Sequence, residues 1–119
     1  MKKLHLNKSI LINWLNQINR EVFDNKIKSI DSIRLVMKEK DIRQRFVCCW
    51  YYPQSHKLVF FEKAHKTEFD AFVTMAHELI HIYQKECGFD NYGLNHGGKF
   101  FKYFADKICK AYEFERKGF

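Results

Sequence analysis

Residues 72–84 read FVTMAHELIHIYQ. In and around this stretch, apolar residues recur every three or four positions, at Phe69, Phe72, Val73, Ala76, Ile80 and Tyr83. This is the periodicity of an amphipathic helix. Thr67 could cap the first turn together with Asp70, three residues later. Gly88 has the conformational freedom to end the helix after its last turn. The sequence therefore predicts a long helix from Thr67 to just before Gly88.

The predicted helix carries an H-E-x-x-H motif formed by His77, Glu78 and His81. Because a helical turn takes about 3.6 residues, the two histidines lie one above the other on the same face. Two imidazoles so placed can hold one Zn²⁺ at about 2.0–2.1 Å. Glu78 would lie beside the metal, where it can take a proton from zinc-bound water and return it to a leaving amine. The alternative is two histidines that only satisfy hydrogen bonds on a partly buried helix.

A catalytic zinc needs a third protein ligand and one open position. His96 is the leading candidate, because it follows the predicted helix stop and a turn-rich stretch that could fold back to the metal. Gly97 and Gly98 would permit a tight turn after it. The competing carboxylates are Glu86, Asp90, Glu113 and Glu115. The other histidines have no spacing relation to the motif and are expected on the surface: His5, His56 and His65.

Longer zinc-protease signatures are not matched. In the extended motif H-E-x-x-H-x-x-G-x-x-H, Gln84 stands at the glycine and Cys87 at the third histidine. A thermolysin-like arrangement would need a much longer chain for its substrate-binding half. The motif therefore points to a small metalloprotease that takes its third ligand from further along the chain.

The rest of the chain alternates between helix-like and strand-like patterns. Helices are expected over 8–25 and 99–116, and strands over 32–37, 46–52 and 58–62. The second and third strands are close enough in sequence to form a hairpin. No repeat, low-complexity tract or linker interrupts this order. The pattern predicts one α+β domain over residues 1–119.

Composition excludes several classes of protein. The chain has 119 residues, of which 46% are hydrophobic and 20 are aromatic, which is enough to bury a core and argues against disorder. No stretch approaches the roughly 18 uncharged apolar residues of a membrane span. The first 15 residues, MKKLHLNKSILINWL, lack the unbroken apolar region of a signal peptide, so the protein is expected in the cytoplasm.

The net charge is +7, from 21 Lys and Arg against 14 Asp and Glu. A field of this sign attracts polyanions, so non-specific DNA binding through the basic surface is a reasonable expectation. The basic residues are scattered along the chain, however, which is also typical of ordinary solvated faces. An alternative function is therefore a nucleic-acid-binding module in which zinc is purely structural.

The four cysteines show no C-x-x-C pair: Cys48, Cys49, Cys87 and Cys109. A cysteine zinc site or a thioredoxin-like motif is therefore poorly supported. We expect them to be small buried side chains in a reducing compartment.

The strand expected over residues 46–52 ends with Trp50, Tyr51 and Tyr52. These rings could stack on nucleic-acid bases or line a substrate groove, or they could divide between a core-facing and an exposed row. Substrate main chain could pair with an edge strand beside the motif helix. The strand over 58–62 is the candidate for that edge, because it immediately precedes the helix.

Three sequence blocks together resemble the SprT-like zinc metallopeptidase family. They are NREVFDNKI at 19–27, FVTMAHELIHIYQ at 72–84 and NHGGKFF at 95–101. The last block resembles the family's H-G-x-x-F segment, which supplies the third zinc ligand and opens the next helix. The similarity extends over about residues 10–112.

The resemblance implies a minimal zincin-like metalloprotease fold. This fold has an N-terminal helix, a small three-stranded sheet, an active-site helix and a C-terminal helix. It also implies that zinc is held by His77, His81 and His96 and that Glu78 is the general base. The family acts on proteins associated with DNA, and many members append a cysteine zinc ribbon that this sequence lacks. Such a minimal form suits a bacterial protein of the cytoplasm, or a phage protein that works in the cytoplasm of its host.

Overall fold

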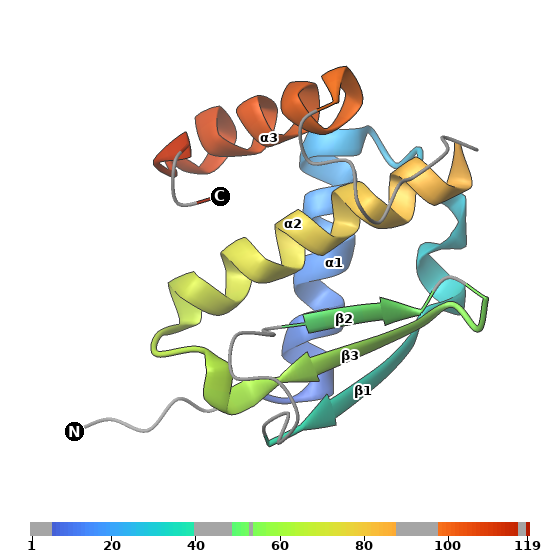
Figure 1. Cartoon of the computed structure of the whole chain (residues 1–119), viewed down its shortest axis with the longest axis vertical. Coiled ribbons are helices and arrows are strands. Elements are labelled where there is room, and N and C mark those ends of the chain that lie inside the picture. The colour runs from blue at the N-terminus through green and yellow to red at the C-terminus, as the bar shows by residue number, and fades with distance from the viewer. Residues whose placement is uncertain (1–5, 40–48, 53, 88–97, 117–118) are drawn as a thin grey trace.

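The computed structural model describes residues 6–39, 49–52, 54–87, 98–116 and 119 (Figure 1). The elements in chain order are α1 (Lys8–Phe23), η1 (Lys28–Ser32), β1 (Arg34–Lys38), β2 (Cys49–Tyr52), β3 (Lys57–Phe61), η2 (Glu62–Ala64), α2 (Glu68–Glu86) and α3 (Lys99–Tyr112). The two η elements are short 3₁₀ turns. The described part thus contains three helices and a three-stranded sheet, which confirms the predicted α+β class.

Side-chain caps define where the first two helices begin. The Asn7 side chain accepts a hydrogen bond from the Ile10 amide at 2.9 Å, and this bond starts α1. Thr67 accepts one from the Asp70 amide at 3.1 Å and starts α2. The expected cap at Thr67 is therefore confirmed. The last helix is shorter than expected, because Glu113 adopts a left-handed backbone (φ 60°) and ends α3 at Tyr112.

The turn after α1 is fixed by one buried amide. Asn19 Nδ2 donates to the Ile27 carbonyl at 3.2 Å, and Asn19 Oδ1 accepts from the Ile27 amide at 3.1 Å. Between them, Asp24 and Asn25 both adopt left-handed backbones, which these two residue types tolerate. The Asn19 side chain thus closes the chain reversal that leads from α1 towards the sheet.

The strand order is β1-β3-β2, with β1 parallel and β2 antiparallel to β3. The predicted hairpin between β2 and β3 is confirmed. The prediction that 58–62 is an edge strand is wrong, because β3 pairs with a neighbour on both sides. After β1 the chain forms β2 at the opposite edge of the sheet, and β3 then fills the position between them. The edges are therefore β1 and β2 (Figure 1).

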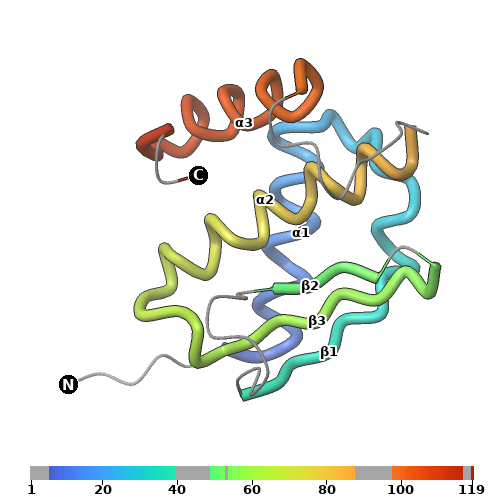
Figure 2. Tube along the Cα trace, in the orientation of Figure 1, coloured from blue at the N-terminus to red at the C-terminus, as the bar shows by residue number. Residues whose placement is uncertain are grey.

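The hydrophobic core lies between the helices and one face of the sheet. Leu35, Leu58, Phe60 and Cys49 contribute the sheet side of the core. α2 packs against α1, α3 and β2, and in Figure 2 its trace runs between α3 and the sheet. None of the helices in the described ranges combines the length and apolar character needed to span a bilayer.

Two of the cysteines behave as expected. Cys49 and Cys109 are buried and carry free thiols. Cys87, at the C-cap of α2, is also a free thiol but is exposed, so its expected burial is wrong. Cys48 lies outside the described residues.

We predict that Asn19→Ala destabilises the protein by about 2–4 kcal/mol, because two backbone groups of the buried Ile27 lose their partner and each costs about 1–3 kcal/mol. Asn16→Ala is the control, since exposed Asn16 only donates to the Ile12 carbonyl within α1. Urea unfolding followed by circular dichroism measures both. Equal effects of the two substitutions would contradict the assigned role of Asn19.

Candidate metal centre

The two histidines of the motif lie on successive turns of α2 with their rings together. Nε2 of His77 and Nε2 of His81 are 3.2 Å apart. Two nitrogens that share one tetrahedral Zn²⁺ at about 2.0–2.1 Å are separated by about 3.3 Å. His81 is buried and His77 is half-buried. This spacing suits two ligands to a single divalent cation, and it is equally the distance of a hydrogen bond between the two rings, the alternative for this pair.

Gln84 orients one of these ligands. Nδ1 of His81 lies 2.8 Å from the Oε1 atom of Gln84, a buried residue on the next turn of α2. Because the amide oxygen only accepts, Nδ1 must donate, which leaves the lone pair of the neutral ring on Nε2. Such support for a metal-binding histidine raises its affinity. Gln84 is not part of the H-E-x-x-H motif and was not among the predicted site residues, although its position three residues after His81 places it beside that ring.

Glu78 is half-buried, and burial of its carboxyl raises its pKa to about 8. Desolvation is the only cause of this rise, since it disfavours the charged form. A divalent cation beside the group would act in the opposite direction and favour the carboxylate. Without a cation, burial favours the protonated carboxylic acid of Glu78. A cation beside it would favour the carboxylate.

The first turn of α3 covers the histidine pair. The Phe101 ring lies 5.1 Å from the His77 ring and 5.2 Å from the His81 ring, measured between centroids. The Phe119 ring lies 5.5 Å from His77. These aromatic contacts exclude water from one side of the pair and fix the start of α3 against it.

The remaining ligand candidates are only partly described. His96, the predicted third ligand, lies outside the described residues, as does Asp90. The Glu86 carboxylate accepts a hydrogen bond of 2.8 Å from the backbone amide of Lys28, the first residue of η1. Within the described ranges, no three His, Cys, Asp or Glu side chains form a cluster suited to a metal ion.

The expectation of a surface position is wrong for His65, which is buried. Its Nδ1 lies 3.0 Å from the Phe61 carbonyl and its Nε2 lies 2.8 Å from Thr74 Oγ1. The ring also stacks on Phe60 at 4.5 Å. His65 therefore ties η2 to α2, a tertiary role that no local pattern reveals.

His56 is half-buried rather than fully on the surface. Its ring joins the Tyr51 hydroxyl at 2.7 Å to the Ser29 carbonyl at 2.8 Å. These contacts give the ring a structural role at the β2–β3 turn. His5 lies outside the described residues.

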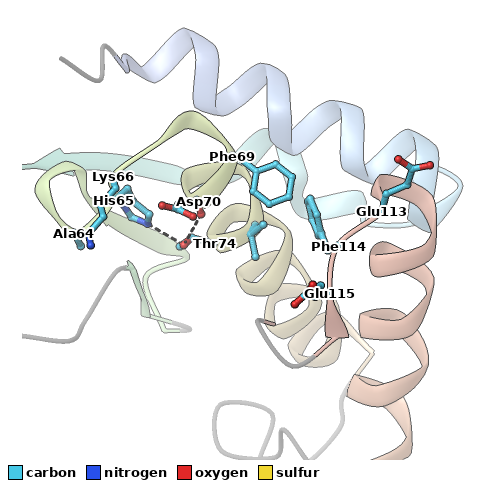
Figure 3. Close-up of a pocket in the computed structure, with 10 residues that line it drawn as sticks. Ala64, His65, Lys66, Phe69, Asp70, Thr74, Glu113, Phe114 and Glu115 are labelled. Atoms are coloured by element: carbon cyan, nitrogen blue, oxygen red, sulfur yellow. Dashed lines mark hydrogen bonds between the residues drawn. The ribbon is translucent and has the colours of Figure 1, made fainter. Parts of the chain in front are cut away.

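A pocket of about 550 Å³ lies between the start of α2 and the segment after α3 (Figure 3). Its lining residues are Ala64, His65, Lys66, Phe69, Asp70, Val73, Thr74, Glu113, Phe114 and Glu115. Two of the competing carboxylates, Glu113 and Glu115, are thus located here. His77, Glu78 and His81 do not line this pocket, so it is separate from the histidine pair.

Comparisons of the chain with protein-family models, with curated proteins and with solved structures find no match. The similarity to the SprT-like family therefore rests on the three sequence blocks quoted above.

We predict that Gln84→Met lowers the affinity of the protein for Zn²⁺ by about 10- to 100-fold, because the His81 ring loses its hydrogen-bond acceptor while most of the side-chain volume remains. Competition with a chromophoric chelator measures the affinity. Lys85→Met, at the exposed neighbouring position, should leave it unchanged. Unaltered zinc affinity in Gln84→Met would show that Gln84 does not support a ligand.

We predict that His65 makes the protein less stable in mild acid. Burial lowers the pKa of His65 below its ordinary value of about 6.5, so the unfolded chain binds a proton more readily than the folded one. The stability that depends on neutral His65 is therefore complete above about pH 6.5 and falls as the pH drops from there towards the lowered folded-state pKa.

Urea unfolding at several pH values from about 5 to about 8, on both sides of the ordinary histidine pKa, measures this loss. His65→Gln retains a side chain that can bond Thr74 but does not titrate, so its stability should depend less on pH than that of the unsubstituted protein. Parallel pH profiles for the two proteins would refute the role of His65.

Proposed function

We propose that this chain is a zinc-dependent endopeptidase of the SprT-like, zincin-like type. In this proposal His77, His81 and His96 hold the cation and Glu78 is the general base. The main support is the 3.2 Å approach of the two Nε2 atoms on successive turns of α2, with Glu78 directly after the first ligand. The spacing suits one shared cation and the glutamate suits proton transfer beside it.

The covalent chain allows His96 to be the third ligand. Phe101 contacts both histidine rings, and position 96 precedes it by five residues. Five residues span at most about 18 Å even when fully extended. This length of chain permits His96 to reach the pair.

The proposed reaction is hydrolysis of a peptide bond. When bound, Zn²⁺ would supply Lewis acidity, acidifying the attacking water and polarising the substrate carbonyl. Glu78 accepts the proton from the attacking water and passes it to the leaving amine nitrogen. Gln84 holds the His81 ring in the orientation that ligation needs, and Phe101 keeps bulk water from one side.

The alternative, a structural zinc in a nucleic-acid-binding module, explains fewer of the observations. A structural zinc is closed by four protein ligands and has no use for a carboxylic acid next to the first of them. Burying the Glu78 carboxyl is costly, as its raised pKa shows. A role in proton transfer gives a reason for that cost, which favours the hydrolase.

We expected a substrate to pair with an edge strand beside the motif helix. Because β3 is the central strand, we propose β2 for this role. β2 is an edge strand and packs against α2, the helix with the histidine pair. An extended segment of a protein substrate could add to this edge through main-chain hydrogen bonds. The family resemblance and the net charge of +7 together favour substrates that are associated with DNA. The free thiols of the described cysteines suit a reducing cytoplasm.

We predict that Glu78→Gln retains zinc but loses at least about 100-fold in the rate of protein cleavage, because the amide cannot accept a proton. His81→Ala should lose both zinc and cleavage. Metal content after gel filtration and the cleavage of casein, or of the chain itself, measure the two properties. Glu68→Gln, at an exposed position in the first turn of α2, should preserve both.

Full cleavage activity in zinc-loaded Glu78→Gln would remove Glu78 from the mechanism. Zinc bound by the unsubstituted protein and lost in His81→Ala, with no cleavage by the unsubstituted protein, would instead favour the structural alternative.

A further inference from the structure

The pocket between the start of α2 and the segment after α3 has an exposed phenylalanine on its rim (Figure 3). Phe69, in the first turn of α2, is 56% exposed. The other exposed aromatic rings of the described chain lie elsewhere, Tyr103 on α3 and Trp50 and Tyr52 on β2. Tyr51 between the last two packs against the core, which confirms the expected division of these aromatics between a core-facing and an exposed row. Phe69 is therefore the exposed ring that borders a cavity.

The end of α3 builds the opposite side of the pocket. Glu113 adopts a left-handed backbone, and the Phe114 amide after it donates to the Cys109 carbonyl at 2.9 Å. This turn brings the Phe114 ring edge-on to Phe69, with centroids 4.7 Å apart and planes at 87°. Val73, one turn after Phe69 on α2, lines the same cavity. The pocket therefore has an apolar wall that contacts within the protein hold in place.

The charged groups of the pocket are mainly acidic. Three exposed carboxylates and one exposed cation line it: Asp70, Glu113, Glu115 and Lys66. His65, which also lines it, is mostly neutral at about pH 7, because burial lowers its pKa. Arg116, next to Glu115 in sequence, forms an ion pair with Asp106 at 2.7 Å. On a chain with a net charge of +7, the pocket is thus a local concentration of negative charge.

Two of the carboxylates flank the apolar wall. In Figure 3, Asp70 lies on the side of His65, and Glu115 follows Phe114 on the other side. Glu113 lies beyond Phe114, further from Asp70. Asp70 and Glu115 are therefore the carboxylates that a ligand lying against the wall would meet first.

We propose that this pocket binds an arginine side chain presented by a protein partner. The guanidinium would lie against the ring of Phe69, since aromatic rings attract cations, and would donate to Asp70 and Glu115. Arginine suits the site better than lysine does, because its planar group can stack on a ring and bond a carboxylate through two N–H groups at once. The proposal thus rests on charge complementarity combined with an aromatic wall.

The size and openness of the pocket favour a protein segment over a small free cation. The volume of about 550 Å³ lies within the usual range of ligand sites, about 300–1,000 Å³, and exceeds what one guanidinium needs. It leaves room for the partner's backbone and a neighbouring residue beside Val73. Most of the lining side chains are exposed, so an isolated cation would gain little from carboxylates that are already in water.

An anionic partner is the main alternative, because the first turn of α2 points free amides towards this end of the helix. That turn contains Glu68 and Asp70, however, and Asp70 lines the pocket itself. Their charges offset the positive end of the helix and would repel an anion. The electrostatics of the pocket therefore favour a cation.

The pocket is separate from the histidine pair. His77 lies seven residues after Asp70 on α2, about 10 Å further along the helix axis, and it does not line the pocket. Binding of an arginine here needs neither the cation nor Glu78. The proposal therefore stands whether or not the chain cleaves proteins.

Fluorescence anisotropy of a labelled, end-blocked pentapeptide, with one central arginine among alanines, tests the proposal on the unsubstituted protein. We expect the peptide with glutamine in place of arginine to bind at least about fivefold more weakly, because it cannot pair with either carboxylate. The lysine peptide should fall between the two. This series needs no protein variant, so it does not depend on how a variant folds.

The carboxylates are tested by Asp70→Asn combined with Glu115→Gln, which should weaken binding of the arginine peptide by at least about fivefold. The matched control is Asp24→Asn combined with Asp31→Asn, at exposed positions after α1 and in η1. It changes the net charge equally and should alter the affinity by less than about twofold. Equal losses in the two double variants would show that only the overall charge matters and would overturn the proposal.

The aromatic wall is tested by Phe69→Leu, which keeps an apolar side chain but removes the ring. Binding of the arginine peptide should weaken about two- to fivefold, the usual effect of losing one cation–ring contact. Tyr103→Leu, on α3, should leave it unchanged, since Tyr103 is 62% exposed and does not line the pocket.

Three further results would each overturn the proposal. One is tighter binding of spermidine than of the arginine peptide in competition, which would make the pocket a site for small cations. Another is a preference for the same peptide with a central glutamate. The third is no binding of the arginine peptide at low salt with protein at up to about 1 mM.

Discussion

The approach of two imidazoles on successive turns of α2 is the constraint around which the other elements are arranged. It requires a helix that is rigid at this point and covered on several sides, and the structure supplies both. α1 and the sheet pack along α2, α3 covers the rings with Phe101, and Gln84 holds one ring from within the same helix. Burying such a pair is unfavourable unless its polar atoms find partners; in the structure the two Nε2 atoms lie within hydrogen-bond distance of each other, and Nδ1 of His81 bonds Gln84.

Local patterns were sufficient to predict most of the elements. The cap at Thr67, the helical period around residues 72–84 and the hairpin between the second and third strands all depend on residues close in sequence. The histidine pair was predictable for the same reason, because a spacing of four residues on a helix fixes which side chains meet. His96 lies outside the described residues, so the third ligand stays a prediction.

The features that the sequence did not predict depend on contacts between distant residues. The central position of β3 follows from a strand order that no alternation of side chains encodes. His65 is buried because Thr74 and Phe61 come together around it, and α3 ends early because of the backbone at Glu113. The strand order and the burial of His65 depend on tertiary contacts, and the end of α3 depends on the backbone conformation of one residue. Helix and strand propensities of the sequence specify neither.

The strand order also restricts the sequence of events in folding. β2 and β3 are joined by a short turn and can pair early, since closing a short loop costs little conformational entropy. Among the described strands, β1 pairs only with β3, in parallel, so it has no partner there until β3 is available. Parallel pairing across a longer connection is the slower step. From this topology we expect the hairpin to form first and to act as the template onto which β1, the strand synthesised first, docks last.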